Sequence, residues 1–247
     1  MEYRILGKSG LRISRLGFGG IPIQRIDAAR TKALMHRLME LGINYIDTAR
    51  GYTVSEEYIG YGLEGIRDKF VLATKSMART KEAMAADIDI SLKNLRTDYI
   101  DIYQFHNPDF CPKPGDGTGL YEAMLEAKAQ GKIRHIGITN HRLAVAKEAV
   151  ESGLYETLQF PFCYLATEPD LELVKLCGEK NMGFIAMKGL SGGLLTNAKA
   201  CYAFMCEYDN VLPIWGVQRM EELEQFLACG KEEPELTEDL RHVIQVD

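Results

Sequence analysis

The chain has 247 residues, of which 46% are hydrophobic and 26% charged, the balance of a globular protein with a large core. A net charge of −6 without a basic stripe argues against a nucleic-acid partner. No apolar run is long enough to span a membrane, and the first residues lack the apolar centre of a signal peptide. The six cysteines are dispersed without a C-x-x-C pair, which predicts reduced thiols, no metal site and a cytoplasmic location.

Residues 3–14 open the chain as a predicted β-hairpin that turns between Gly7 and Gly10. Eight short runs follow, most of them rich in Ile, Val, Phe and Tyr. Because nearly all are apolar on both faces, they predict parallel strands that are covered by helices. The runs are residues 16–18, 44–47, 70–74, 100–105, 135–138, 157–160, 183–186 and 211–215.

Amphipathic stretches alternate with these strands. Ser55, followed by two glutamates, is the predicted N-cap of the second helix. The other predicted helices are residues 28–41, 81–95, 119–130, 141–152, 170–181, 198–207 and 219–229. Eight strand–helix units without a linker predict the α/β class, as one (β/α)8 TIM barrel domain of residues 1–247 with an N-terminal β-hairpin. A doubly wound sheet is the alternative, and a surface helix is expected after Gly230.

Polar side chains gather where the predicted strands end, which is where (β/α)8 barrels carry their active sites. Asp47 and Tyr52 follow the second strand, Lys75 the third and His106 the fourth. A free phenol has a pKa near ~10, and an adjacent ammonium lowers it. Lys75 is expected to act in this way on Tyr52, with Asp47 holding Lys75 in place and His106 orienting a ligand oxygen. Each residue alone is better explained structurally, but their joint placement favours an acid–base site.

Further polar and glycine positions lie at the same end of the predicted barrel. Thr139 and Asn140 follow the fifth strand, where capping of the next helix and ligand contact are both open. Gln159 lies inside a buried strand and needs a partner. For Met187, core packing and ligand contact are both open interpretations. The remaining candidates are Gly20, Ile21, Lys188, Gly189, Leu190, Gly192 and Gly216.

Four motifs in order resemble aldo-keto reductases. They are NYIDTARGY with SEEYIG at residues 44–60, VLATK at 71–75, DYIDIYQFH at 98–106 and KIRHIGITN at 132–140. The resemblance is collinear over residues 3–226. The segment AMKGLSGGLL at 186–195 is most similar to the subgroup that often carries a C-terminal iron–sulfur extension, for which clustered cysteines are absent here.

This resemblance implies a role for each candidate. Tyr52 would donate a proton to a carbonyl oxygen, and His106 would position the substrate. Asp47 and Lys75 would tune the acidity of Tyr52. Thr139, Asn140 and Gln159 would bind the nicotinamide carboxamide, and Met187 would stack on its ring. Gly20, Ile21 and the 188–192 loop would approach the rest of the cofactor, together with Gly216, Gln218 and Arg219. The expected cofactor is NADPH. Because only Arg219 is suited to pair with a 2′-phosphate in this segment, NADH is the alternative.

The function implied is hydride transfer between NAD(P)H and the carbonyl of an aldehyde or ketone. One alternative is a regulatory or assembly subunit that binds the nicotinamide cofactor with little turnover, because fold does not determine function. Another is cofactor-free isomerase or lyase chemistry. The expected partner is a small carbonyl compound, not nucleic acid or membrane. Since the loops that cover the pocket in many members are short here, a second copy or a partner protein could cover the open barrel mouth.

Overall fold

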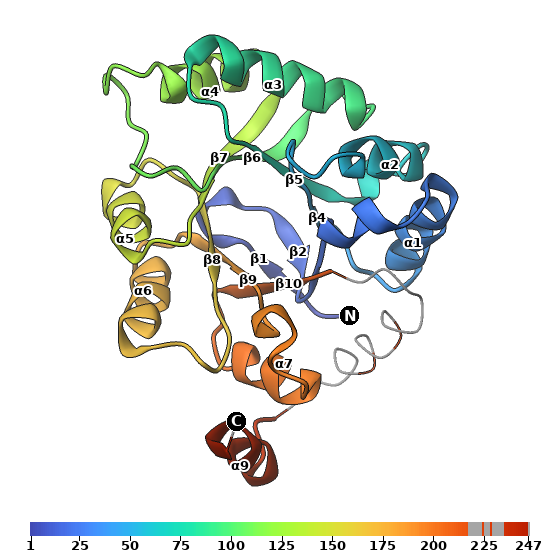
Figure 1. Ribbon diagram of the computed structural model, residues 1–247, viewed down its shortest axis with the longest axis vertical. Coiled ribbons are helices and arrows are strands. Elements are labelled where there is room, and N and C mark those ends of the chain that lie inside the picture. Colours follow the sequence, from blue (N-terminus) through green and yellow to red (C-terminus); the bar gives the residue numbers. More distant parts are fainter. Residues whose placement is uncertain (217–223, 225–227, 229–234, 247) are drawn as a thin grey trace.

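The computed structural model describes residues 1–216, 224, 228 and 235–246. Eight parallel strands close into a barrel in the order β10-β3-β4-β5-β6-β7-β8-β9, which confirms the predicted fold (Figure 1). The hydrogen-bonded ring leaves no free sheet edge among these strands. The strands are β3 (Gly17–Gly19), β4 (Tyr45–Asp47), β5 (Val71–Ser76), β6 (Ile100–His106), β7 (Ile133–Thr139), β8 (Thr157–Pro161), β9 (Gly183–Met187) and β10 (Val211–Trp215).

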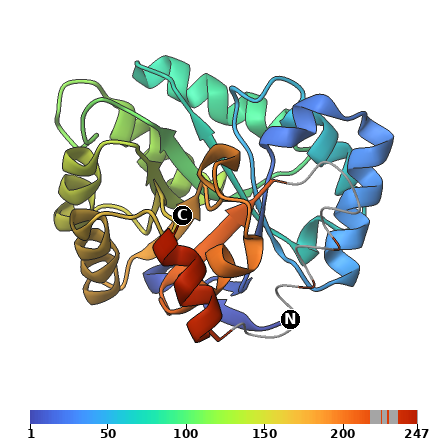
Figure 2. The same ribbon diagram turned by 60° about the horizontal axis from the view of Figure 1, so that its bottom comes forward.

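Helices cover the outside of the barrel in chain order (Figures 1 and 2). They are α1 (Ala28–Glu40), α2 (Ser55–Gly62), α3 (Lys81–Asn94), α4 (Leu120–Ala129), α5 (Leu143–Ser152), α6 (Glu168–Glu179) and α7 (Ala198–Cys206), and α9 (Glu238–Val246) follows them in the chain. The predicted helix at 219–229 falls almost entirely outside the described residues. The surface helix expected after Gly230 is α9, which lies beside α7. Within the described part of the chain, no helix has the length and apolarity needed to cross a bilayer.

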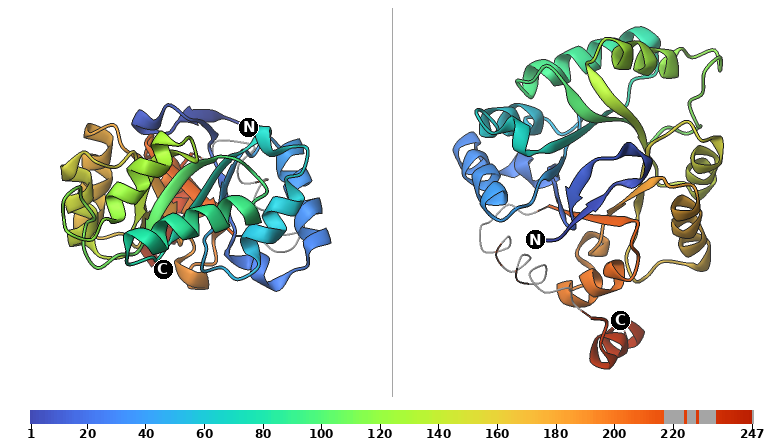
Figure 3. Two further views of the ribbon diagram at one scale, coloured as in Figure 1. Left: turned by 90° about the horizontal axis from the view of Figure 1, so that it is seen from above. Right: turned by 180° about the vertical axis from the view of Figure 1, so that it is seen from behind.

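The predicted hairpin closes one end of the barrel (Figure 3). Strands β1 (Tyr3–Ile5) and β2 (Arg12–Ser14) pair antiparallel around a short 3-10 turn. Leu6 and Ile13 are buried against Ile185 and Leu212, which point into the barrel. Because β9 begins at Gly183, close to the hairpin turn, the hairpin blocks the end where strands start. A ligand site is therefore left to the opposite end, where strands finish.

The strand register brings the predicted polar residues to that opposite end. His106 is aligned with Thr139, and Thr139 with Gln159, across β6, β7 and β8. Lys75 is aligned with Gln104 across β5 and β6. Because side chains alternate along a strand, Gln104 and His106 share the inward face of β6.

The start of α2 differs from the prediction. Ser55 is the first residue of the helix, and the N-cap is Val54, which makes no side-chain cap. The buried Ser55 hydroxyl instead lies 2.8 Å from the Thr48 hydroxyl and donates to the Gly20 carbonyl oxygen at 3.0 Å. The predicted capping role was wrong because this hydroxyl faces the neighbouring strands, where contacts far apart in the chain are available.

Candidate active site

A cavity of about 470 Å³ opens at the ends of the strands and in the loops that follow them. The four residues predicted to carry acid–base chemistry all line it, together with most of the predicted cofactor contacts. The lining residues are Gly19, Gly20, Ile21, Pro22, Asp47, Tyr52, Lys75, His106, Thr139, His141, Gln159, Met187, Lys188, Gly189, Leu190, Gly192, Gly193, Ile214, Trp215 and Gly216.

Asp47 and Lys75 form a buried ion pair at the floor of this cavity. The Lys75 ammonium donates to Asp47 Oδ2 at 2.6 Å and to the Thr48 carbonyl oxygen at 2.8 Å. Burial raises the pKa of Asp47 and lowers the pKa of Lys75, and in each case the partner's charge opposes the effect of burial. The amides of Gln104 and Gln159 also donate to the Asp47 carboxylate, at 3.3 and 3.5 Å. These donors allow a carboxylate to be buried beside an ammonium.

Tyr52 and His106 lie edge to face above this pair, with ring centroids 5.9 Å apart. Lys75 Nζ is 5.1 Å from the centroid of the Tyr52 ring. Burial raises the pKa of Tyr52, and the charge of Asp47 adds to the rise. The pKa of Tyr52 in the protein alone is therefore raised and not lowered as expected, because burial dominates.

His106 is a neutral imidazole at pH 7. Burial, followed by the charges of Lys75 and His141, lowers its pKa to about 4. Its Nδ1 is buried and has no hydrogen-bond partner among the described residues. A neutral ring offers one N–H donor and one acceptor, so His106 can hydrogen-bond a ligand oxygen without adding a charge.

Most of the predicted cofactor contacts line the cavity, with three exceptions. Asn140 is buried and does not line it: its side chain donates to the Pro108 carbonyl oxygen and accepts from the Arg142 backbone N–H, both at 2.8 Å. These bonds join the loop after β6 to the turn before α5, so the structural reading of Asn140 is the one its contacts support. Gln218 and Arg219 lie outside the described residues.

Three of the cavity glycines are required by packing. A Cβ at Gly189 would lie 2.3 Å from Trp215 Nε1, and one at Gly216 would lie 2.6 Å from the ring of Pro22. A Cβ at Gly20 would lie 2.7 Å from the Asp47 carbonyl oxygen. Any larger side chain would displace the loops that form the cavity wall.

Sequence reasoning missed Gln104, His141 and Trp215. Trp215 and His141 line the cavity, and Gln104 lies inside the barrel against Asp47. Gln104 had a readable signal, since it lies two residues before His106 in a strand that is otherwise mostly apolar. His141 had none, because its approach to the cavity depends on loop conformation, whereas Trp215 is the last residue of β10 and its place at a strand end was a readable signal.

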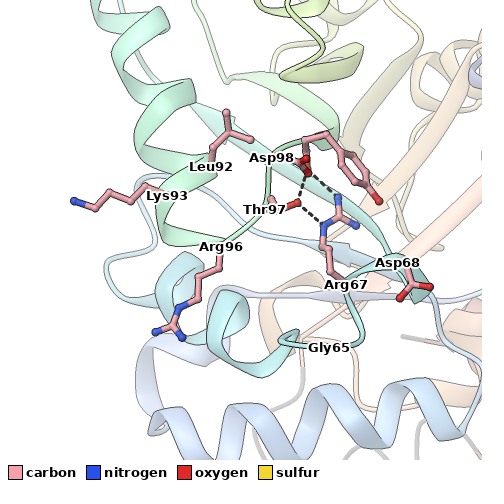
Figure 4. A pocket seen from close by; sticks show the side chains of 9 residues that line it. Gly65, Arg67, Asp68, Leu92, Lys93, Arg96, Thr97 and Asp98 are labelled. Atoms are coloured by element: carbon pink, nitrogen blue, oxygen red, sulfur yellow. Dashed lines mark hydrogen bonds between the residues drawn. The ribbon is translucent and has the colours of Figure 1, made fainter.

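A second cavity, of about 740 Å³, lies at the other end of the barrel (Figure 4). Its central cation, Arg67, is fully engaged in holding neighbouring loops. It donates to the Thr97 hydroxyl, to the carbonyl oxygens of Phe70 and Tyr99, and to the Asp101 carboxylate. This guanidinium therefore has a structural role, and the four predicted acid–base residues lie around the first cavity.

The residues around the first cavity suit a nicotinamide group. The Thr139 hydroxyl and the Gln159 amide come from adjacent strands, and each lies 3.9 Å from Met187 Sδ. Hydroxyl and amide side chains match the donors and acceptors of a carboxamide. Met187 and Trp215 add polarizable and aromatic surface for a flat ring.

Comparison with known proteins identifies the family. The sequence pattern described as "Aldo/keto reductase family" matches residues 15–200. L-galactose dehydrogenase of Arabidopsis thaliana is 31% identical over 220 aligned positions, covering 79% of this chain and 67% of the plant protein. The NADH-specific methylglyoxal reductase of Escherichia coli is 28% identical over 222 positions, covering 77% and 68%. An aldo-keto reductase of Bacillus halodurans in its holo form superposes with a TM-score of 0.86 at 26% identity, covering 100% of this chain and 96% of that one.

The chain therefore belongs to the aldo/keto reductase family of NAD(P)-dependent oxidoreductases, folded as a TIM barrel. The plant and Escherichia coli proteins were each matched over about two thirds of their own length.

Proposed function

We propose that this protein reduces the carbonyl group of a small aldehyde or ketone with NADPH or NADH. The observation that carries the proposal is the shared cavity: Tyr52, His106 and the Asp47–Lys75 pair all line it, with the pair joined at 2.6 Å. A proton donor, an orienting hydrogen-bond donor and a charge that stabilises the donor's anion are what carbonyl reduction requires of a protein.

Each residue has a defined part in this reaction. When bound, the nicotinamide cofactor supplies the hydride that reaches the carbonyl carbon. Tyr52 gives its phenolic proton to the carbonyl oxygen, and its raised pKa keeps that proton in place until the oxygen becomes basic. Lys75 stabilises the phenolate that forms, and neutral His106 donates a hydrogen bond to the same oxygen. Solvent returns the proton to Tyr52 after the alcohol leaves.

Cofactor contacts would come from the strand ends and the 188–192 loop. Thr139 and Gln159 would hold the carboxamide. Gly20, Ile21 and Met187 line the cavity, where they would contact the nicotinamide ring. The loop residues that line the cavity would approach the phosphates: Lys188, Gly189, Leu190 and Gly192. Calorimetric titration with NADPH and with NADH tests this assignment and decides between the two. A named NADH-specific relative makes NADH a serious candidate.

The proposal extends to the whole chain. Residues 1–247 would act as a single cytoplasmic domain on a small carbonyl substrate, alone or with a second copy or partner over the cavity mouth. The dispersed cysteines, without a C-x-x-C pair, support a reducing location. The similarity to the iron–sulfur subgroup rests on residues 186–195 alone.

Replacement of Tyr52 tests the proton donor. Tyr52→Phe keeps the ring and removes the acidic hydrogen, so carbonyl reduction is expected to fall by about 10²–10⁴-fold while cofactor affinity changes little. Tyr58→Phe, in helix α2 and outside the cavity lining, is the matched control and should keep wild-type activity. The measurement is steady-state reduction of a panel of aldehydes and ketones with the tighter cofactor.

The outcomes separate the candidate functions. Undiminished turnover in Tyr52→Phe would reject the assigned acid. Saturable NADPH or NADH binding by the wild type without turnover on any carbonyl would favour a cofactor-binding subunit. Activity without measurable binding of either cofactor would favour cofactor-free chemistry.

A further inference from the structure

Gln104 links two parts of the site from inside the barrel. It lies on β6, is fully buried, and does not line the cavity, whereas both of its partners do. Its amide nitrogen donates to Asp47 Oδ1 at 3.3 Å and to Gln159 Oε1 at 3.0 Å. Gln159 Nε2 in turn donates to Asp47 Oδ2 at 3.5 Å. Three side chains from β4, β6 and β8 therefore form a closed hydrogen-bonded ring.

The ring gives the Gln159 amide a definite direction. An ionised carboxylate only accepts hydrogen bonds, so Asp47 must face N–H groups. Gln104 supplies one N–H to Asp47 and the other to Gln159 Oε1, which turns Gln159 Nε2 toward Asp47 and Met187 Sδ. Without the N–H from Gln104, the two ends of the Gln159 amide could exchange places.

The carbonyl oxygen of the Gln104 side chain is unfavourable for folding. Its Oε1 is buried without a hydrogen-bond partner among the described residues. The strand beside it carries Gly137, where a Cβ would lie 3.0 Å from Gln104 Cγ, so the barrel interior leaves room for this side chain. An apolar residue would avoid the unsatisfied oxygen. The amide is therefore explained by what its N–H groups do.

We propose that Gln104 is a positioning residue that holds the Gln159 amide and the Asp47 carboxylate in one fixed arrangement. Through Gln159 it would prepare the contact with the nicotinamide carboxamide, and through Asp47 it would orient the partner of Lys75. The cofactor part of this inference rests on the proposed function, whereas the ring itself does not.

A double-mutant cycle tests the cofactor part. Gln104→Met keeps the side-chain length and removes both N–H groups, and should raise the dissociation constant of the tighter dinucleotide by about 3–10-fold, the effect of one lost hydrogen bond. Gln159→Met should weaken binding by a similar factor. If Gln104 acts through Gln159, the double variant should bind about as weakly as Gln159→Met alone. Independent, multiplying effects would overturn the proposal.

Thr157→Val is the matched control. The Thr157 hydroxyl is also buried in the barrel without a hydrogen-bond partner among the described residues, but it is not part of the ring. This variant should bind the dinucleotide as the wild type does. Gln104→Asn, which keeps an amide too short to reach both acceptors, is expected to fall between wild type and Gln104→Met and serves if the methionine variant does not fold.

Side-chain amide NMR tests the ring without reference to cofactor or activity. In protein labelled with ¹⁵N, the Gln159 NH₂ resonances should move in Gln104→Met or Gln104→Asn and remain in place in Thr157→Val. Unmoved Gln159 resonances would overturn the positioning role even if the enzyme is active. A wild-type protein that neither binds a dinucleotide nor reduces carbonyls would instead reject the proposed function and leave this NMR comparison to decide on the ring.

Discussion

Burial controls protonation at the level of single residues in this site. It raises the pKa of Tyr52 and Asp47 and lowers that of Lys75 and His106. The charges of Lys75 and Asp47 oppose the effect of burial on each other's pKa but do not outweigh it. The consequence at neutral pH is a protonated phenol beside a neutral imidazole, a pair that can donate two hydrogen bonds to one ligand oxygen.

The neutral state of His106 predicts a pH dependence of stability. Its pKa is about 4 in the folded protein against 6.5 for the free side chain, so the unfolded chain binds one more proton between these values. Stability should therefore fall as pH drops from 6.5 to 4, by up to about 1.4 kcal/mol per pH unit from this residue. His106→Gln should reduce that slope when unfolding in urea is measured at several pH values. His242→Gln, on the exposed face of α9, is the control, and equal slopes for wild type and His106→Gln would contradict the assignment.

Glu56 joins the elements that carry Tyr52 and Lys75. Its carboxylate is buried at the start of α2 and accepts four hydrogen bonds. One oxygen accepts from Thr74 on β5 and Ser91 on α3, both at 2.8 Å, and the other from Arg50 at 3.0 Å and Asn94 at 3.2 Å. The loop with Tyr52 and the strand with Lys75 are thus both bonded to the Glu56 carboxylate, which fixes the position of the phenol relative to the ammonium.

Two adjacent glutamates allow this contribution to be measured. Glu56→Ala leaves Arg50 and three other donors without their acceptor, so the free energy of unfolding should fall by about 3 kcal/mol or more. Glu57→Ala, one residue further along α2 and exposed, should change it by less than about 0.5 kcal/mol. Urea unfolding of the two variants makes the comparison, and equal losses would show that the buried network is not stabilising.

At the scale of the whole molecule, the hairpin that closes the barrel and the candidate active site lie at opposite ends of the barrel. At the first end, the β1–β2 hairpin seals the barrel with apolar side chains. At the second, strand ends and loops form the cavity with Asp47, Tyr52, Lys75 and His106. This separation allows stability and chemistry to be changed independently, as is general for (β/α)8 barrels.

Truncation of Leu6 tests the separation. Leu6 is 2% exposed and packs against Gly183, so Leu6→Ala should destabilise the protein by about 2–5 kcal/mol. The proposed carbonyl reduction, measured on the folded variant, should remain within about twofold of wild type, because the cavity lies at the other end. Ile5→Ala, at a side chain 59% exposed, is the control with little effect on unfolding. A large loss of activity in folded Leu6→Ala would show that the two ends are coupled.

The order of apolar runs in the chain was sufficient to predict the barrel, the hairpin and the end that carries the site. These features depend on local hydrophobic periodicity, which can be read from the sequence, and on the rule that parallel strands finish at one edge of a sheet. The same rule placed Asp47, Tyr52, Lys75 and His106 around one cavity before any contact was known.

Only the tertiary structure decided what those side chains do to one another. The Gln104 ring joins β4, β6 and β8, and the Ser55 hydroxyl bonds to Thr48 and Gly20 across the barrel wall. The Asn140 amide donates to the Pro108 carbonyl oxygen in the loop after β6. The direction of the Tyr52 pKa shift depends on burial and on Asp47. Hydrogen-bond partners and desolvation are set by distances between residues remote in sequence, and a linear pattern holds no such distances.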